Sequence, residues 1–149
     1  MTKTYTNLNS FLANYPKRQV IDRDYKFLNH AEQISRLSPR TQHRVGCVIA
    51  QRNEVIGIGY NTVKTHPFQA RWNKRSPYLH AEMMALLDAM KNKNFKPERS
   101  TIYVSRYSRH GTLGCSYPCE HCWPALSHIG VRQIVCYGHD NVPTKIAVN

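Results

Sequence analysis

The sequence lacks any long hydrophobic run. No stretch of about 18 apolar residues occurs, so no membrane-spanning helix is expected. Residues 1–15 are polar and contain no apolar segment of the kind that a signal peptide needs, so we expect a cytoplasmic protein. Hydrophobic residues still make up 41% of the 149, which suits one folded domain over residues 1–149. Residues 1–20 are expected to form an N-terminal extension and residues 138–149 a short C-terminal tail.

Acidic residues are also few. Nine Asp and Glu residues stand against 21 Lys and Arg residues, and the formal net charge is +12. Such a surplus either gives a solvated basic surface or attracts phosphate groups, of one nucleotide or of a nucleic-acid strand. Four cations between Lys64 and Arg75 surround Trp72, and both interpretations remain open there. A second basic group, from Lys91 to Arg99, follows a predicted helix and is interpreted as structural, because cations at a helix C-terminus interact favourably with its dipole.

The five cysteines are an odd number in a chain without a recognisable secretion signal, which favours a reducing compartment over a disulfide framework. Cys47 and Cys136 lie in apolar runs and are expected to be buried, unreactive thiols. Cys115 is interpreted as an exposed loop thiol. The alternative is a second metal site that Cys115 shares with a neighbouring histidine such as His110.

Two short motifs carry the chemistry, His80-Ala81-Glu82 and Pro118-Cys119-Glu120-His121-Cys122. Three ligands, His80, Cys119 and Cys122, would leave one position of a tetrahedral zinc ion open for water, as in catalytic zinc sites. The sequence therefore predicts that these three residues bind Zn²⁺, with Glu82 as the proton carrier beside them. A thioredoxin-like redox pair is the rival interpretation of the CxxC spacing. His80 and Glu82, at the start of a predicted helix, favour the metal site over the redox pair.

Hydrophobic periodicity predicts alternating helices and strands, and hence an α/β fold. Helices are expected at residues 24–37, 80–92 and 119–129, and strands at 44–51, 54–60, 101–105 and 133–137. Asp22 or Asp24 is expected to cap the first helix, and Gly130 to end the third. The short link at Arg52-Asn53 predicts a hairpin. Residues 61–79 and 106–118 are expected to be irregular.

The motifs and this order of elements resemble the zinc-dependent cytidine and deoxycytidylate deaminase superfamily. The resemblance extends over residues 24–137 and implies a three-layer α/β/α cytidine deaminase-like fold. Its mixed sheet would have about five strands, with the zinc-site helices on one face. The segment from Gly46 to Thr62, which ends its strand pair in Gly59-Tyr60-Asn61, is similar to deoxycytidylate deaminases in particular. Members of the superfamily commonly assemble, so a homo-oligomer is expected.

The same resemblance assigns roles to single residues. Glu82 would move protons between water, the cytosine ring and the departing amine. The backbone N–H of Ala81 would bond the pyrimidine carbonyl, and Asn61 and Pro118 would lie against the substrate. A turn asparagine with unusual backbone angles is the alternative interpretation of Asn61.

Two features depart from the deoxycytidylate deaminase pattern. The loop at residues 106–118 is long, and its Arg109 and Tyr117 are candidates to meet a phosphate or to stack on a base. The chain after residue 137 is too short for a parallel strand with its crossover, so Lys145 to Val148 can pair only as an antiparallel return. The resemblance associates an antiparallel last strand with free-nucleoside deaminases, and a parallel one with deoxycytidylate, polynucleotide and transfer-RNA deaminases.

Three functions therefore stay open. The favoured function is zinc-dependent deamination of cytosine to uracil on a free nucleotide such as dCMP. The second is deamination of cytosine in single-stranded DNA or RNA, which the net charge and the long loop favour. The third is a non-catalytic, zinc-stabilised binding protein on the same fold, which would give Glu82 no purpose.

Overall fold

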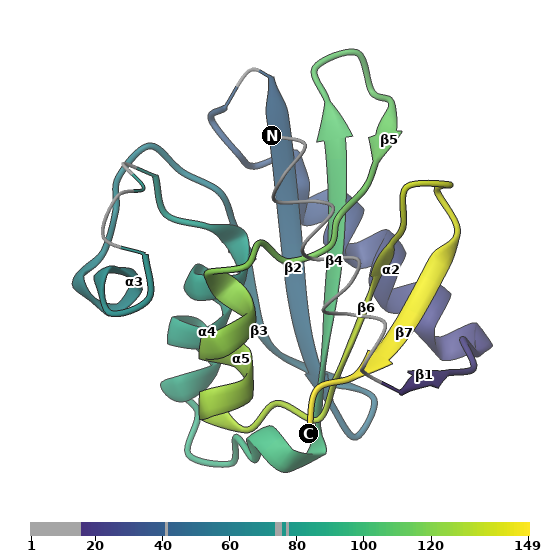
Figure 1. Ribbon diagram of the computed structural model, residues 1–149, viewed down its shortest axis with the longest axis vertical. Coiled ribbons are helices and arrows are strands. Elements are labelled where there is room, and N and C mark those ends of the chain that lie inside the picture. Colours follow the sequence, from purple (N-terminus) through teal and green to yellow (C-terminus); the bar gives the residue numbers. More distant parts are fainter. Residues whose placement is uncertain (1–15, 41, 74–75, 77) are drawn as a thin grey trace.

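The computed structural model describes residues 16–149 except 41, 74, 75 and 77. Helices and strands are interspersed along the chain (Figure 1). In chain order they are β1 (Lys17–Arg18), α2 (Asp22–Ser35), β2 (His43–Gln51), β3 (Glu54–Tyr60), α3 (Pro67–Ala70), α4 (Ala81–Met90), η1 (Pro97–Arg99), β4 (Ser100–Ser108), β5 (Leu113–Gly114), α5 (Cys122–Ile129), β6 (Gln133–Tyr137) and β7 (Pro143–Ala147). In this part of the chain, no helix has the length and apolar character needed to cross a membrane.

The strands form one mixed sheet in the order β1-β7-β6-β4-β2-β3, and β5 pairs with the outer end of β4. The pairing of β4 with β6 is parallel, and the other pairings are antiparallel. The sheet has seven strands, where the sequence predicted about five. The two unexpected strands, β1 and β5, are two residues long, too short to give a period-2 hydrophobic signal.

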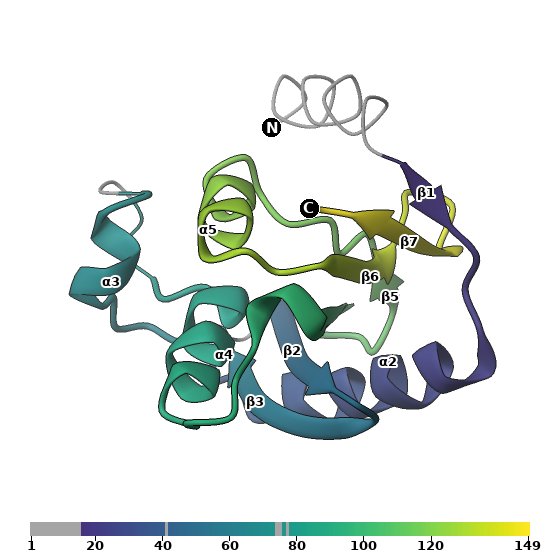
Figure 2. The ribbon, with the colours of Figure 1, turned by 90° about the horizontal axis from the view of Figure 1, so that it is seen from below.

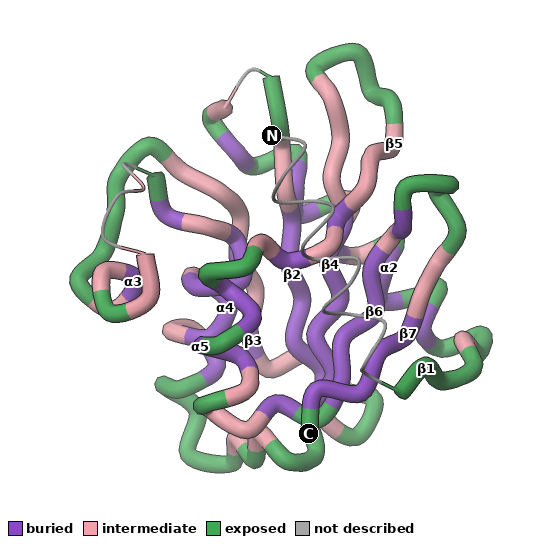
Figure 3. Tube along the Cα trace, in the orientation of Figure 1, coloured by how far each residue is buried: buried purple, intermediate pink, exposed green. Residues whose placement is uncertain are grey.

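Helices cover both faces of this sheet and make three layers, as the resemblance implied (Figures 1 and 2). Alternate residues of β2 separate the two cores, because successive side chains of a strand point to opposite faces. Val48 and Ala50 pack with Phe27 and other residues of α2, whereas Cys47 and Ile49 belong to the core beneath α4 and α5. Burial follows the same division, since the sheet and the inner helix faces are buried while the connecting loops are exposed (Figure 3).

Helix α2 begins at Asp22 and ends at Ser35, two residues before the predicted end. Its N-cap is Ile21 rather than a predicted aspartate, and the side chain of Asp24 accepts a hydrogen bond of 2.9 Å from the backbone N–H of Ile21. Leu37, which fits the helical spacing, is 58% exposed because the helix has already ended.

The hairpin between β2 and β3 turns at Arg52 and Asn53, as predicted. Both residues have positive φ angles, 53° and 64°, which is the backbone of a two-residue hairpin turn. Further along β3, Gly59 lets α4 approach the sheet. A Cβ atom there would overlap the backbone oxygen of Ala81 and lie 2.5 Å from the nitrogen of Ala85. This close approach fixes the N-terminus of α4 over the end of the sheet.

The C-terminal segment returns as the antiparallel strand β7, which pairs with β6 through a turn containing Asn141 at φ 60°. The segment before α2 also joins the sheet, because β1 pairs with β7 and the N–H of Ala147 donates to the oxygen of Pro16. The extension and the tail are therefore partly sheet, while the organisation of residues 1–149 as a single domain stays a prediction.

Candidate functional site

Three predicted metal ligands, His80, Cys119 and Cys122, come together although the histidine is 39 or more positions away from the thiols in the sequence. The Nδ1 atom of His80 lies 3.7 Å from the Sγ atom of Cys119 and 3.3 Å from that of Cys122. The ligand atoms of all three residues lie within 4.8 Å of one another, and no other such group of three occurs in the described part of the chain.

Two helix N-termini hold these side chains. His80 is the N-cap residue of α4, and Cys122 is the first residue of α5. Helix α5 begins three residues later than predicted, because Cys119 precedes it in a turn whose carbonyl accepts from the N–H groups of Cys122 and Trp123. Helix N-termini favour negative charge, so this placement stabilises thiolates.

The thiols influence each other strongly. The hydrogen bond from Cys122, followed by that from His80, lowers the pKa of Cys119 to about 4 despite its burial. The same bond to Cys119, together with burial, raises the pKa of Cys122. Burial by itself lowers the pKa of His80, but the hydrogen bond to Cys119 and the charges of Glu82 and Cys119 outweigh it and raise that pKa. The group thus already stabilises one thiolate.

Backbone and ring contacts fix the orientation of His80. The backbone N–H of His80 donates to Oε1 of Gln69 at 2.7 Å, and the ring atom Nε2 lies 3.2 Å from the hydroxyl oxygen of Ser76. Gln69 is fully buried in α3, and its amide also donates to the oxygen of Tyr78 at 2.6 Å. The segment 61–79 was predicted to be irregular, and no motif or periodicity in it points to Gln69 as a positioning residue.

Glu82 lies in the first turn of α4 and is 5% exposed. Burial raises the pKa of its carboxyl group, and the nearby charge of His80 opposes that rise. Glu82 borders the same cavity as His80 and Cys119. The Glu82 carboxyl group is not one of the three candidate metal ligands, so it is free to contact a molecule that binds in the cavity.

The donor set suits zinc. Two cysteine sulfurs and one imidazole nitrogen form an ordinary zinc ligand set, and three protein ligands are typical of catalytic sites. A tetrahedral zinc ion with ordinary bond lengths needs N···S separations of about 3.6 Å. The observed separations of 3.3 and 3.7 Å lie on either side of that value.

A cavity of about 350 Å³ opens over this group. It is lined by residues from the ends of β2, β3 and β4, from the start of α4 and from the segment before α5. They are Arg40, Val45, Asn61, Tyr78, Leu79, His80, Ala81, Glu82, Val104, Arg106, Cys115, Ser116, Tyr117 and Cys119. Its size matches that of small-molecule sites in general.

Asn61 and Ala81 both line the cavity, and their contacts with a substrate stay a prediction. The side-chain oxygen of Asn61 accepts from the N–H of Val45 at 2.9 Å, and its amide donates to the oxygen of His43 at 2.7 Å. Its φ angle is not positive, so the alternative of a strained turn residue does not apply. Ala81 is the first residue of α4, and N–H groups at that position have no partner within the helix.

Two arginines at the cavity were missed by the sequence analysis, Arg40 and Arg106. The guanidinium group of Arg40 lies 3.7 Å from the ring centre of Tyr78, which also lines the cavity. Burial and then the charges of Arg106 and Arg40 lower the pKa of His43, which shows that both cations act on one region. Neither arginine belongs to a motif, and only the fold brings them together.

The long segment before α5 is anchored rather than loose. Leu113 and Gly114 form β5, and the hydroxyl of Ser116 donates to the oxygen of Val104 at 2.7 Å. Tyr117 consequently lines the cavity, and so does the half-buried Cys115. The neighbouring Pro118 is buried and is not a lining residue.

Several predicted residues lie elsewhere. Arg109 is exposed in the turn after β4, outside the cavity, so its contact with a substrate stays a prediction. Lys64 and Arg71 are exposed and do not line the cavity, while Lys74 and Arg75 lie outside the described residues. The two thiols expected to be inert, Cys47 and Cys136, are fully buried.

A model of the "Cytidine and deoxycytidylate deaminase zinc-binding region" matches residues 21–138. The chain belongs to this family. The matched residues include both motifs, and the His80, Cys119 and Cys122 group fits the Zn²⁺ site of a zinc-binding deaminase region. A search of curated proteins gives no significant match.

Solved structures of other deaminases share the fold. A cytidine deaminase from Burkholderia pseudomallei is 16% identical with a TM-score of 0.60, over 83% of this chain and 91% of that one. A dCMP deaminase from the cyanophage S-TIM5 in apo form is 19% identical with a TM-score of 0.55, over 78% of this chain and 82% of that one. The same phage enzyme in complex with dCMP and dUMP gives a TM-score of 0.54. At these identities the likeness establishes the cytidine deaminase-like fold of the chain.

Proposed function

We propose that this deaminase converts cytosine to uracil on a free nucleotide such as dCMP, using zinc and water. The observation that carries the proposal is a single cavity lined by His80 and Cys119 of the Cys₂His group, by the buried Glu82 and by two arginines. The chemistry of the first two suits hydrolytic deamination, and the two cations suit a substrate that bears phosphate.

His80, Cys119 and Cys122 would hold the zinc ion. When bound, zinc lowers the pKa of a coordinated water and makes it a nucleophile at neutral pH. Glu82 would take one proton from the water and deliver it to N3 of the cytosine ring. Once the oxygen is bonded to C4, Glu82 would take the proton of that hydroxyl group and pass it to the departing amino group. The oxygen of water ends on C4, and ammonia leaves. The backbone N–H of Ala81 bonds the pyrimidine carbonyl, and Asn61 contacts the substrate.

The phosphate preference rests on Arg40 and Arg106. Both line the cavity, and an arginine fork matches phosphate oxygens in geometry as well as charge. The ring of Tyr78 restrains Arg40 by stacking, which reduces the entropy lost when a phosphate binds. The phage dCMP deaminase that shares this fold has been solved with dCMP and dUMP, which agrees with the proposed substrate class.

Two observations favour other substrates. The net charge of +12 favours a single-stranded nucleic acid, and the antiparallel β7 is the arrangement that the resemblance associates with free-nucleoside deaminases. A mass-spectrometric assay of the zinc-loaded protein should therefore compare dCMP, CMP, deoxycytidine, cytidine and a cytosine-containing oligonucleotide. Turnover of the nucleotides well above the others supports the proposal. Turnover of the oligonucleotide alone, with a steep loss at raised salt, would replace it with the strand substrate.

The substitution Arg40→Ala tests the phosphate contact directly. We expect kcat/KM for dCMP to fall about 10- to 100-fold, the equivalent of one charge-assisted hydrogen bond, while kcat/KM for deoxycytidine stays unchanged. Arg36→Ala is the matched control, because Arg36 is exposed directly after α2 and pairs with Glu32. Equal losses on the nucleotide and the nucleoside would show that Arg40 supports the cavity rather than the phosphate.

A further inference from the structure

A second cavity, of about 380 Å³, lies at the opposite end of the sheet. It is bordered by the start of α2, the β2–β3 turn, η1 and the starts of β4 and β6. Along β2, Val45 lines the candidate active site and Ala50 lines this second cavity, and the two side chains point to opposite faces of the sheet. The two cavities are therefore separate sites.

Four arginines surround this cavity, Arg23, Arg52, Arg99 and Arg132. Each comes from a different segment, and all four are exposed. Within the described residues none of the four forms an ion pair. Glu54 and Glu98 lie close in sequence to Arg52 and Arg99, but they are exposed and do not line the cavity. The positive charge of the four arginines is therefore not neutralised by acidic lining residues at the cavity edge.

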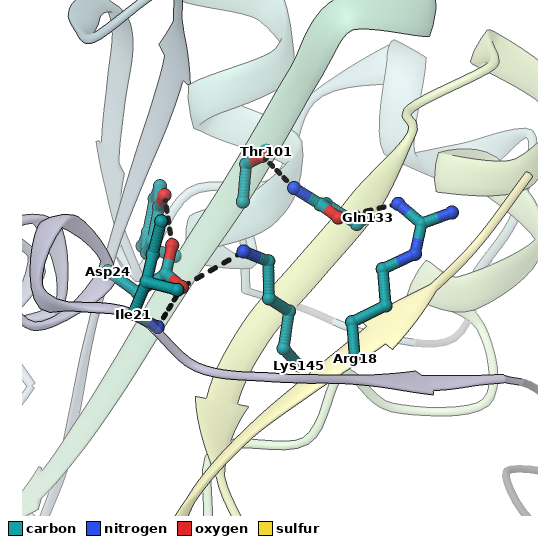
Figure 4. Close-up of polar contacts among 7 residues, drawn as sticks. Arg18, Ile21, Asp24, Thr101, Gln133 and Lys145 are labelled. Atoms are coloured by element: carbon teal, nitrogen blue, oxygen red, sulfur yellow. Dashed lines mark hydrogen bonds and ion pairs between the residues drawn. The ribbon is translucent and has the colours of Figure 1, made fainter.

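The floor of the cavity is polar and fixed. The carboxylate of Asp24 accepts hydrogen bonds from Lys145 at 3.0 Å and from the backbone N–H of Ile21 at 2.9 Å (Figure 4). It also accepts a hydrogen bond of 2.8 Å from the hydroxyl of Tyr103. Asp24 is the single acid among the lining residues, and these three donors already satisfy it. Lys145 is 8% exposed and uses one of its three hydrogens on Asp24, which leaves donor capacity at the floor.

Neighbouring contacts hold the rest of the floor in place. Gln133 donates to Thr101 at 2.8 Å and accepts from Arg18 at 2.7 Å, which joins β6, β4 and β1 (Figure 4). The N–H of Arg132 donates to the oxygen of Pro97 at 3.1 Å, so η1 and the start of β6 stay adjacent. Arg99 and Arg132 thus reach the cavity from a rigid base.

The position of Arg52 is unusual. Its φ of 53° lies in the left-handed region, which glycine, asparagine and aspartate adopt far more readily than a long side chain does. An arginine therefore occupies a turn position at which glycine would make the folded protein more stable. Unfavourable backbone of this kind is common where a side chain is needed for binding.

From these contacts we propose that the second cavity binds the phosphate groups of a small polyanion, such as a nucleoside triphosphate. Five cations and one satisfied acid around one concave floor focus a positive potential there. Arginine forks bind phosphate oxygens in pairs. The cations come from five segments and line one cavity, which suits a compact ligand better than an extended strand.

Arg99 belongs to the basic group from Lys91 to Arg99 that the sequence analysis assigned to a helix C-terminus. The structure corrects this for Arg99, since α4 ends at Met90 and Arg99 closes η1 beside the cavity. Lys93 of the same group is exposed, lies outside the cavity and provides a matched control.

Calorimetric titration of the zinc-loaded full chain tests the proposal, with inorganic tripolyphosphate and a nucleoside triphosphate as the probes. We expect saturable binding at one site per chain. Equal affinities would mean that phosphates alone are recognised, and tighter binding of the nucleotide would mean that the base contributes. Both results support the site.

Variants locate the binding. Arg99→Ala/Arg132→Ala should weaken it at least about tenfold, as expected from lost charge-assisted hydrogen bonds, and Lys93→Ala should change it less than about twofold. Arg52→Gly removes a cation where glycine fits the backbone, so it tests the site even if the double variant folds poorly. The proposal is wrong if no saturable binding occurs, if Lys93→Ala weakens binding equally or if Arg40→Ala abolishes it. Tighter, length-dependent binding of an oligonucleotide to the same arginines would also overturn it.

Discussion

Glu82 can lose its charge without changing the three groups that fit zinc, which makes it the sharpest single-residue test of the proposed chemistry. The substitution Glu82→Gln keeps the size of the side chain and its capacity to form hydrogen bonds, but the amide that replaces the carboxyl group cannot carry protons. We expect turnover to fall by at least about 10²- to 10⁴-fold, the usual contribution of a general acid–base group. Deamination rates measured by mass spectrometry check this.

The zinc content of that variant serves as its control. Metal analysis should give the same ratio of zinc to protein as in the unaltered chain, because His80, Cys119 and Cys122 remain. A Glu82→Gln protein that is folded, zinc-loaded and still fully active would contradict the assigned role.

The metal-binding residues were predictable because their chemistry is confined to a fixed short spacing. Cys119 and Cys122 are three positions apart, and His80 starts a helix whose apolar spacing is clear. Gln69 and Arg40 carry no such signal, since glutamines and arginines are common and a single contact across the fold gives each its role. Contacts of this kind depend on tertiary structure, which the spacing of residues in the sequence does not encode.

At the scale of elements, the contact between Gly59 of β3 and the first turns of α4 sets the position of His80. Gly59→Ala would force α4 away from the sheet, because the added Cβ overlaps the oxygen of Ala81 and approaches the nitrogen of Ala85. We expect a loss of about 1–3 kcal/mol in the free energy of unfolding, typical of overpacking, together with weaker zinc binding. Urea denaturation and a zinc competition assay measure the two effects.

Gly114→Ala is the control for that experiment. A Cβ atom at Gly114 would come no closer than 3.9 Å to Arg106, which is ordinary contact. If both alanine variants lose the same stability, the close packing of α4 on β3 is not the cause.

Longer elements were predicted better than short ones. The hairpin and β6 lie where hydrophobic alternation and turn residues predicted them, and α2 begins and ends two residues earlier than predicted. The short elements α3, β1 and β5 were missed, because a segment of two to four residues has no measurable period. The direction of β7 followed from chain length, since too few residues remained for a crossover.

At the scale of the whole molecule, the Asp24–Lys145 pair joins α2 to β7 across 121 residues of sequence. Asp24 is 1% exposed, so Asp24→Ala would leave the Lys145 cation buried without its partner. We expect a loss of about 3–5 kcal/mol in the free energy of unfolding, measured by urea denaturation. Asp22→Ala, an exposed acid in the same helical turn, should cost about 1 kcal/mol or less. Similar losses in the two variants would contradict a structural role for the buried pair.

Tyr103 of β4 also bonds to Asp24, and its ionisation makes the stability of the protein depend on alkaline pH. Burial, and then the hydrogen bond to Asp24, raise the pKa of Tyr103 well above its usual value, while the charge of Arg23 opposes the rise. The unfolded chain releases this proton near pH 10, whereas the folded protein retains it, so stability is complete below about pH 10 and falls as the pH rises further. Urea denaturation between about pH 9 and pH 11 should show a slope up to about 1.4 kcal/mol per pH unit steeper than in Tyr103→Phe. Since the other tyrosines and the thiols titrate equally in both proteins, parallel slopes would mean that the Tyr103–Asp24 bond does not contribute to stability in this range.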